Sequence, residues 1–537
     1  MTEGSTTSSK TEMPAWVRLA MPSVADMIFI GLLAALVFTP LSVKLLGDAG
    51  IGWHIRTGQL ILATHAVPHV DPFSASMAGN PLFAEPWLAR EWFAGEWLYD
   101  VVVGELEIRL GLNGVVWFTA IIIATIFAGL FQALVQRGAN IVISVSLMLL
   151  ALSASTIHLL ARPHVVSWLF TLIWFWILDT SEGSSPNGNG SHRRRLWILP
   201  LLMLVWVNVH GGFLVGFVLL AIFWVGASWT WFSADGDRIE QVLKKIEAAK
   251  RSRNLLFVGL VSAAVSFVNP YGWKLHVHIY SYLTNTFLIN HIEEFQSPNF
   301  HGLAQKCFAI LLMIVVGTLA IHCRKLRLNA VLIVLFSIYS GLYASRNIPV
   351  SSILLVMVTA PLLCSTNPAR RFLSRMQEIE SNQRGHLWPI FAIVVTTAIA
   401  ANAGLAGSNT LMDAHFDPKR MPVEATNYIQ QQKIQGPILS PDSWGGYLIY
   451  RLNRNEIPPN RRVVIDDRHD LYGEEFLKPY LKMMHVERGW QDFLHEHEPS
   501  CVLLPRDAAL ANVLLEARDW KPIYSDETAI AFVRGAQ

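Results

Sequence analysis

This chain has little charge for its length. Asp, Glu, Lys and Arg make up 15% of its 537 residues, whereas hydrophobic residues make up 52%. A soluble globular protein usually carries about 25% charged residues. The composition therefore excludes an ordinary soluble protein and indicates a chain whose main solvent is lipid. The net charge is only +2, which gives no support for a nucleic-acid-binding protein.

The chain is also poor in cysteine. None of its four cysteines stands in a CxxC motif or a Cys/His ligand pattern. We therefore expect neither a disulfide framework nor a zinc site. The sequence also contains no evident internal repeat and no glycine-rich nucleotide-binding loop. Its first apolar run is too long for the apolar region of a signal peptide and is read as a retained helix.

Long apolar runs dominate the sequence instead. A helix needs about 20 apolar residues to cross the hydrocarbon core. Eleven runs approach this length, with an error of one or two in the count, at residues 25–46, 113–135, 139–158, 164–181, 196–210, 212–232, 254–269, 303–322, 328–345, 348–364 and 387–407. We predict a mostly α-helical, polytopic transmembrane bundle over residues 25–407, preceded by a cytoplasmic tail at 1–24.

The basic residues predict the orientation of this bundle. Lys and Arg near the ends of spans accumulate on the cytoplasmic side of a membrane. With a cytoplasmic N-terminus, five basic clusters all fall on that side, at 137, 193–195, 244–253, 324–327 and 370–384. The segments 47–112, 159–163, 270–302 and 408–537 then lie outside. We expect a multi-pass membrane protein with its N-terminus in the cytoplasm.

The tail at 408–537 has a different pattern. Short apolar runs at 437–439, 463–465, 502–504 and 529–533 alternate with amphipathic stretches at 423–433, 474–484 and 507–517. This alternation is typical of a small α/β domain. About 130 residues are enough to bury a core, so we predict a soluble extracytoplasmic domain.

The first external loop, 47–112, holds the main candidates for chemistry. A loop this long between two spans usually has a function. Asp48 follows the first span, where a carboxylate can act as a general base or bind a metal that bridges a phosphate. A solvated loop residue or a helix cap is the simpler explanation for it. Asp71, which fits a turn, and Glu91 are further acids, and His54 and Arg56 are candidate phosphate ligands.

Other polar residues lie at the outer ends of later spans. Ionisable groups at membrane depth are costly and tend to face a cavity. Each alone also fits an ordinary helix end. On the predicted topology they open to the same side as Asp48, His54 and Arg56, and together these residues compose a mixed acidic and basic cavity suited to an anionic substrate. The set comprises Arg162, His164, Asn208, His210, Asn269 and Arg346.

Several motifs together resemble a known family. They are WHIRTG at 53–58, DPFS at 71–74, ARPH at 161–164, NVHGG at 208–212, NPYG at 269–272, WGGYL at 444–448 and VIDDRHD at 464–470. The chain is similar over nearly its whole length to bacterial polytopic membrane proteins of the GT-C glycosyltransferase type. Many members of that group are uncharacterised, so the resemblance specifies the fold more closely than the reaction.

The resemblance implies glycosyl transfer from a polyprenyl-phosphate-linked donor to a glycan, lipid or protein acceptor at the outer face of a bacterial cytoplasmic (inner) membrane. Asp48 would be the general base, with Asp71 or Glu91 as alternatives. Arg56, Arg162 or Arg346, with His210, would hold the departing lipid phosphate. The sequence leaves open whether a divalent cation takes part.

The tail offers candidates for acceptor contact. Asp466 and Arg468 follow the apolar run at 463–465, and ligands often bind beyond the carboxyl ends of strands. A solvated, internally paired turn is the alternative.

Two other function classes also remain: a transporter or flippase of lipid-linked saccharides, and a non-catalytic envelope assembly protein.

Overall fold

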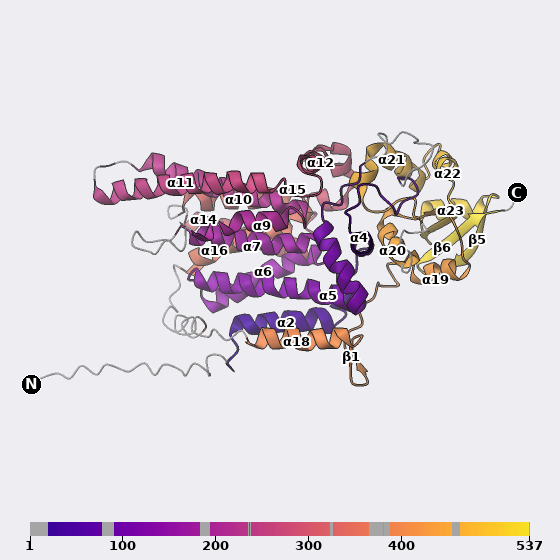
Figure 1. The fold of residues 1–537 in the computed structure, drawn as a ribbon, viewed down its shortest axis with the longest axis horizontal. Helices are drawn as coiled ribbons and strands as arrows, with labels where there is room; N and C mark the ends of the chain where they lie inside the picture. The colour runs from indigo at the N-terminus through magenta and orange to yellow at the C-terminus, as the bar shows by residue number, and fades with distance from the viewer. Residues whose placement is uncertain are drawn as a thin grey trace, which may run out of the picture.

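The computed structural model describes residues 20–77, 91–182, 194–234, 236, 238–322, 326–364, 380, 387–453 and 462–535. Most of the predicted N-terminal tail, and parts of three of the five basic clusters, lie outside these residues. Long helices form an elongated bundle, and a smaller domain of helices and strands sits at one end of it (Figure 1). This arrangement confirms the predicted fold class.

The bundle is built from helices that follow the predicted apolar runs closely. Their bounds are α2 Val24–Phe38, α3 Leu41–Leu45, α5 Trp97–Gln136, α6 Ile141–Ser155, α7 His164–Thr180, α9 Ile198–Trp206, α10 Leu214–Ser233, α11 Ile239–Val265, α14 Leu303–His322, α15 Leu328–Tyr343, α16 Ile348–Cys364 and α18 Leu387–Ala401. Within the described residues, five helical segments are long and apolar enough to cross a membrane, and four shorter apolar helices accompany them. The count of about eleven spans stays a prediction.

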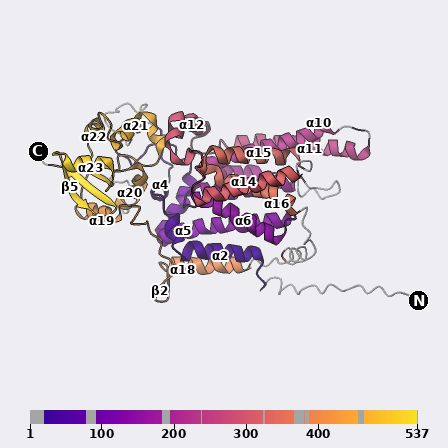
Figure 2. The same cartoon turned by 180° about the vertical axis from the view of Figure 1, so that it is seen from behind.

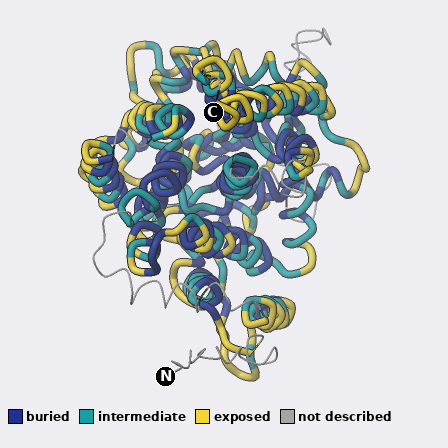
Figure 3. The backbone as a smooth tube through the Cα atoms, turned by 90° about the vertical axis from the view of Figure 1, so that its left-hand side faces the viewer, coloured by how far each residue is buried: buried dark blue, intermediate teal, exposed yellow. Residues whose placement is uncertain are grey.

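Helix α16 forms the centre of the bundle. Nearly every residue from Ile348 to Ala360 is buried, and α16 packs against α6, α7, α14 and α15. Seen end on, the inner tubes are buried and the outer ones carry the exposed faces (Figure 3). Helices α2 and α18 run side by side along one edge (Figures 1 and 2). A helix that is apolar all round, as α16 is, belongs in such an interior.

The predicted loop at 47–112 is largely helical. It contains α4, Gly50–Thr64, and the first part of α5, which is interrupted at Gly111 by a positive φ of 62°. Two glycines let α4 and α5 approach closely. A Cβ on Gly58 would lie 1.7 Å from the Asp100 carbonyl oxygen, and one on Gly104 would lie 2.8 Å from the Gln59 nitrogen. The two backbones are therefore in contact, which only glycine permits.

The C-terminal domain contains a four-stranded mixed sheet in the order β3-β4-β6-β5. Strands β3 and β4 are parallel, whereas β4–β6 and β6–β5 are antiparallel. The elements are α19 Val423–Gln431, β3 Ile438–Leu439, α20 Asp442–Leu452, α21 His469–Met484, α22 Gln491–His497, β4 Cys501–Pro505, α23 Ala509–Glu516, β5 Trp520–Ser525 and β6 Ala529–Arg534. Three predicted strands are present, while the run at 463–465 contributes only bridges at Val463.

The first external loop adds to this sheet. Ser74 pairs in parallel with Val463, which in turn pairs with Ile438 of β3. Gly446 of α20 faces the Ala49 carbonyl, because a Cβ there would lie 2.4 Å from that oxygen. The Gly-Gly pair in the tail therefore serves close backbone packing, as its sequence suggests. The loop and the tail form one packed unit.

Basic residues gather at the opposite end of the bundle. Arg137, after α5, pairs with Asp179 of α7. Glu182 lies within ion-pair distance of both Arg251 and Arg327, at 3.7 and 3.1 Å. Described residues from three of the five basic clusters therefore meet at one end of the bundle, while the orientation in the membrane stays a prediction.

Candidate functional site

A cavity of about 440 Å³ lies where the bundle meets the C-terminal domain. Its walls come from α4, the start of α5, the connections after α6 and α9, the helix α12 (Trp273–Thr284), and the tail. Six of the predicted site residues line it: His54, Arg162, His164, His210, Arg346 and Arg468. Residues from far-separated segments thus converge on one hollow, as the predicted topology led us to expect.

Glu96 is the carboxylate at the centre of the polar wall. It stands at the N-cap of α5 and lines the cavity, with 27% of its side chain exposed. One carboxylate oxygen lies 3.7 Å from Nε2 of His54 and the other 3.7 Å from Nε2 of His210. Burial raises the pKa of Glu96 to about 8, although the Arg162 charge opposes this shift. Glu96 can therefore hold or release a proton near neutral pH.

His54 is fixed by a carboxylate behind it. Its Nδ1 lies 2.6 Å from Oδ1 of Asp100, and Asp100 is fully buried. The contact follows from the glycine crossing, because His54 and Asp100 each lie one helical turn before Gly58 and Gly104, respectively. Burial, followed by the charge of Arg162, holds the pKa of His54 well below its ordinary value.

His210 approaches Glu96 from the other side. Its Nδ1 accepts a hydrogen bond from the Gly212 backbone N–H at 3.0 Å and lies 2.8 Å from Oγ of Ser167. The indole of Trp206 donates to the same Ser167 oxygen at 2.7 Å. Because Nδ1 accepts the Gly212 N–H, a neutral His210 carries its proton on Nε2, which faces Glu96.

Arg162 stands between two acids. Its Nη2 donates to Oδ1 of Asp48 at 2.7 Å and also contacts Asp467 from the tail. Asp48 accepts the backbone N–H of Gly50 at 2.7 Å as well. Asp48 is thus placed beside the cavity through Arg162, while Arg162 and Asp467 line the cavity themselves.

Arg346 forms a second cationic position. Its Nη1 lies 3.1 Å from Oε1 of Glu294, and its guanidinium stacks 4.5 Å from the centre of the Phe295 ring. Burial disfavours the Glu294 carboxylate, but the charges of Arg346 and Arg162 outweigh it and lower the pKa of Glu294 to about 2. Arg346 and Glu294 both line the cavity, so Arg346 joins Arg162 and Arg468 as the third arginine in its lining.

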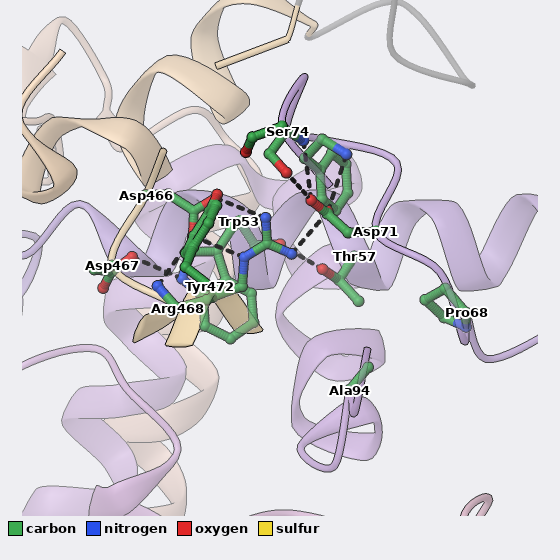
Figure 4. Close-up of polar contacts among 12 residues, drawn as sticks. Trp53, Thr57, Pro68, Asp71, Ser74, Ala94, Asp466, Asp467, Arg468 and Tyr472 are labelled. Carbon is green, nitrogen blue, oxygen red and sulfur yellow. Dashed lines mark hydrogen bonds and ion pairs between the residues drawn. The ribbon is translucent and has the colours of Figure 1, made fainter. Parts of the chain in front are cut away.

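Arg468 holds the loop and the tail together. It donates to Asp71 at 2.9 Å and to the two oxygens of Asp466 at 2.8 and 2.6 Å (Figure 4). The guanidinium also lies 4.7 Å from the centre of the Trp92 ring. Asp71 additionally accepts the backbone N–H of Ser74. Asp71 and Asp466 are buried and do not line the cavity, so each is placed to hold Arg468 rather than to meet a substrate.

Four other predicted residues also lie away from the cavity lining. Glu91 pairs with Lys274 at 2.8 Å on the surface. Arg56 donates to a neighbour within α4, Asn208 accepts the Trp97 indole N–H at 2.8 Å, and Asn269 closes its own turn through three backbone hydrogen bonds. Their polarity satisfies local backbone and side-chain partners.

The sequence reasoning missed Glu96 and Asp100. They stand four residues apart in Glu-Trp-Leu-Tyr-Asp, a spacing that places two acids on one face of a helix. That signal was present, but the candidate acids taken from this loop were Asp48, Asp71 and Glu91. His278, Asp467 and Asp470 also line the cavity, and His278 Nε2 lies 2.9 Å from Asp470 Oδ2.

Helix α12 adds apolar side chains to the cavity lining. Leu275, Ile279, Tyr282 and Leu283 of α12 line the cavity, while Trp273, Val277 and Tyr280 on the same helix are exposed. A helix with apolar residues on both faces can stand between a cavity and lipid. Among the described residues, no three His, Cys, Asp or Glu side chains are grouped to hold a metal ion.

No protein-family model matches this chain, and no curated protein sequence matches it. Its fold is similar to that of an oligosaccharyltransferase from Archaeoglobus fulgidus, solved tethered to an acceptor peptide containing the NVT sequon. The TM-score is 0.55 at 12% identity, over 97% of this chain and 74% of that one. ArnT from Cupriavidus metallidurans, solved bound to undecaprenyl phosphate, aligns with a TM-score of 0.48 at 12% identity, over 95% and 99% of the two chains. The first likeness shows that this chain has a GT-C-like fold, which the sequence motifs predicted.

Proposed function

We propose that this protein is a membrane glycosyltransferase that transfers a sugar from a polyprenyl-phosphate-linked donor to an acceptor hydroxyl. The observation that carries the proposal is the cavity, which combines the guanidinium groups of Arg162 and Arg346, a protonatable carboxyl group and apolar side chains of α12. Such a donor has a phosphate, a sugar and an isoprenoid chain, and each part matches one of these features.

Arg162 and Arg346 are the proposed ligands of the donor phosphate, with His210 beside them. Arginine binds phosphate through a planar fork of N–H donors. As the anomeric carbon leaves the phosphate oxygen, negative charge develops there, and nearby cations stabilise it. The isoprenoid chain would lie along the α12 wall and continue into lipid.

The reaction also needs a carboxylate to take the proton of the acceptor hydroxyl. Asp48 is the candidate given by its position after the first span, and it pairs with Arg162 beside the cavity. The structure adds Glu96, which lines the cavity directly. No step in this proposal requires a metal ion.

The cavity's place in the bundle supports an enzyme over a flippase. A transporter is expected to bind its substrate near the bilayer midplane, between repeated halves. Here the polar residues gather at the end that carries the C-terminal domain. With the basic clusters cytoplasmic, this end faces the outside of the bacterial cytoplasmic membrane. Partners of the reaction would be a lipid-linked sugar and a glycan, lipid or protein acceptor.

The test is sugar release from undecaprenyl-phosphate-linked sugars by the purified full chain in lipid nanodiscs. We expect turnover by the wild type and a loss of about 100-fold or more in a variant that lacks the base. The Asp48→Asn variant is compared with Asp413→Asn, since Asp413 is exposed in the tail. Equal turnover with Asp48→Asn would rule out Asp48 as the base. A wild type that cleaves no polyprenyl-phosphate sugar would contradict the proposed function.

A further inference from the structure

The cavity contains a row of carboxyl, imidazole and hydroxyl groups, of which the sequence analysis singled out only the two histidines. The row runs Asp100, His54, Glu96, His210 and Ser167, with contacts of 2.6, 3.7, 3.7 and 2.8 Å. Its members come from α4, α5, α7 and the connection after α9. Asp100 and Glu96 both line the cavity, but the Asp100 side chain is fully buried at one end of the row, whereas 27% of the Glu96 side chain is exposed.

We infer that Glu96 is the residue that takes the acceptor proton in the proposed transfer, and that the His54–Asp100 pair and His210 position its carboxyl group. The inference rests on the proposed function and names the catalytic base within it. Asp48 is then a positioning residue, which holds Arg162 at the cavity wall.

The two imidazoles offer Glu96 opposite kinds of partner. In the tautomer in which Nδ1 of His54 donates to Asp100, the lone pair of Nε2 faces Glu96. His210 carries its proton on Nε2, because the Gly212 backbone N–H donates a hydrogen bond to Nδ1. A carboxylate can therefore accept from His210, and a carboxylic acid can donate to His54. Both 3.7 Å separations leave room for a small closure or a bridging water.

In the proposed transfer with Glu96 as the base, one bond forms at the anomeric carbon as another breaks. The acceptor hydroxyl oxygen forms a bond to the anomeric carbon, and its proton passes to the Glu96 carboxylate. The bond between that carbon and the phosphate oxygen breaks, and its electron pair leaves with the polyprenyl phosphate. Arg162 and Arg346 both act on the Glu96 carboxyl group electrostatically, so the base and the departing phosphate share one wall.

Several charges set the pH at which Glu96 releases its proton. Burial is the main influence and favours the protonated form, so the pKa is raised to about 8. Arg162 and Arg346 favour the carboxylate, whereas Asp470 and Glu294 disfavour it. The groups that face Glu96 are His54, Asp100, Arg162, His210, Glu294, Arg346 and Asp470. A base with this pKa gains activity as pH rises toward 8, because only the carboxylate accepts a proton.

The first measurement does not depend on the substrate. Infrared titration of the full chain in nanodiscs follows the carboxylic C=O band, which Glu96 should lose with a midpoint near pH 8. Glu96→Gln should remove this component. Glu105→Gln is the matched control, since Glu105 lies on the same helix in an exposed pair with Arg109. An identical titration in wild type and Glu96→Gln overturns the inference.

The second measurement is turnover of an undecaprenyl-phosphate-linked sugar as a function of pH. Glu96→Gln should lower kcat about 100-fold or more and abolish the rise toward pH 8. Asp48→Asn should keep that rise while KM increases. His54→Asn should shift the midpoint of both titrations, an effect that a purely structural role would not produce. Wild-type turnover that Glu96→Gln leaves within about threefold overturns the inference, whereas a wild type without turnover contradicts the proposed function itself.

Discussion

At the scale of single residues, Arg468 has the most demanding environment. Its guanidinium and both acids that bind it are buried. Removing one partner from a buried ion pair leaves a charge without compensation, and that loss typically costs 3–5 kcal/mol. This network also explains why two predicted site residues are internal: the predicted acceptor contact Asp466 and the candidate acid Asp71 both have Arg468 as their partner.

Asp71→Ala should therefore destabilise the protein by about 3–5 kcal/mol. It also removes the acceptor for the Ser74 backbone N–H. Thermal unfolding in detergent, followed by tryptophan fluorescence, measures the effect. Asp413→Ala, at an exposed aspartate, should leave the unfolding midpoint nearly unchanged. Equal midpoints for the two variants would show that the Arg468 network does not hold the loop to the tail.

The His469–Asp442 pair gives the tail a pH-dependent stability. His469 Nε2 lies 2.7 Å from Asp442 Oδ2. Burial disfavours the charged form of each residue, but the hydrogen bond and opposite charge of its partner favour that form more strongly. The pKa of His469 is therefore raised and the pKa of Asp442 is lowered. The histidine contribution is complete below about pH 6.5 and is lost as pH rises through its folded pKa. The aspartate contribution is complete above about pH 4 and is lost as pH falls through its folded pKa.

We thus expect the stability difference between wild type and Asp442→Asn to be largest between about pH 4 and 6.5, at about 1.5–3 kcal/mol. The difference should shrink as pH rises further, because His469 loses its proton. Unfolding midpoints of both proteins across this range provide the measurement. A difference that grows from pH 6.5 to 9 would contradict the assigned charge states.

At the scale of elements, the crossing of α4 and α5 sets the geometry of the site. Gly58→Ala would place a Cβ 1.7 Å from the Asp100 carbonyl oxygen, so the helices must separate. We expect a loss of several kcal/mol in stability and loss of the His54–Asp100 contact. Gly31→Ala is the control, because nothing lies within 4 Å of its Cβ, and it should be neutral or gain up to about 1 kcal/mol. Equal unfolding midpoints for both variants would argue against the close crossing.

The elements also show what sequence alone could predict. Uninterrupted apolar runs predict helices such as those at residues 303–322 and 348–364, because a run of that length has few other folded forms in lipid. Helix α4 was not predicted as an element, since its Gly-rich, mixed sequence carries a weak helical pattern. Strand β5 was also missed, because its exposed face interrupts the apolar run.

The candidate site was predictable in part for a similar reason. Arg162, His210 and Arg346 stand at the ends of apolar runs, so their depth and side of the bundle could be inferred. Glu96 could not be ranked above Glu91, because the choice depends on which face of α5 meets α4. That choice is made by the glycine crossing, a contact between segments that the sequence does not place.

At the scale of the whole molecule, bundle and tail share the cavity. Asp467, Arg468 and Asp470 of the tail line it, and Val463 pairs with the first external loop. The link between α18 and the tail runs through a short hairpin of β1 Leu405–Ala406 and β2 Asn409–Thr410. The covalent link is therefore only one of several connections between the two parts.

A protease site introduced at the turn of this hairpin tests the shared unit. After cleavage, we expect the tail to remain bound to the membrane fragment. The Arg468 network persists, and so do the contacts of Ser74 with Val463 and of Ser76 with Val464. Co-purification of the two fragments in detergent is the readout. Release of the tail into the soluble fraction would mean that it folds and sits independently of the cavity.

The central claim is that the cavity binds a polyprenyl phosphate. Electron cryo-microscopy of the full chain in nanodiscs with undecaprenyl phosphate tests it most directly. We predict phosphate density within hydrogen-bonding distance of Arg162 or Arg346, close to Glu96, with the isoprenoid chain along α12. Phosphate density among the basic residues at the opposite end, or an empty cavity at saturating lipid, would contradict the account.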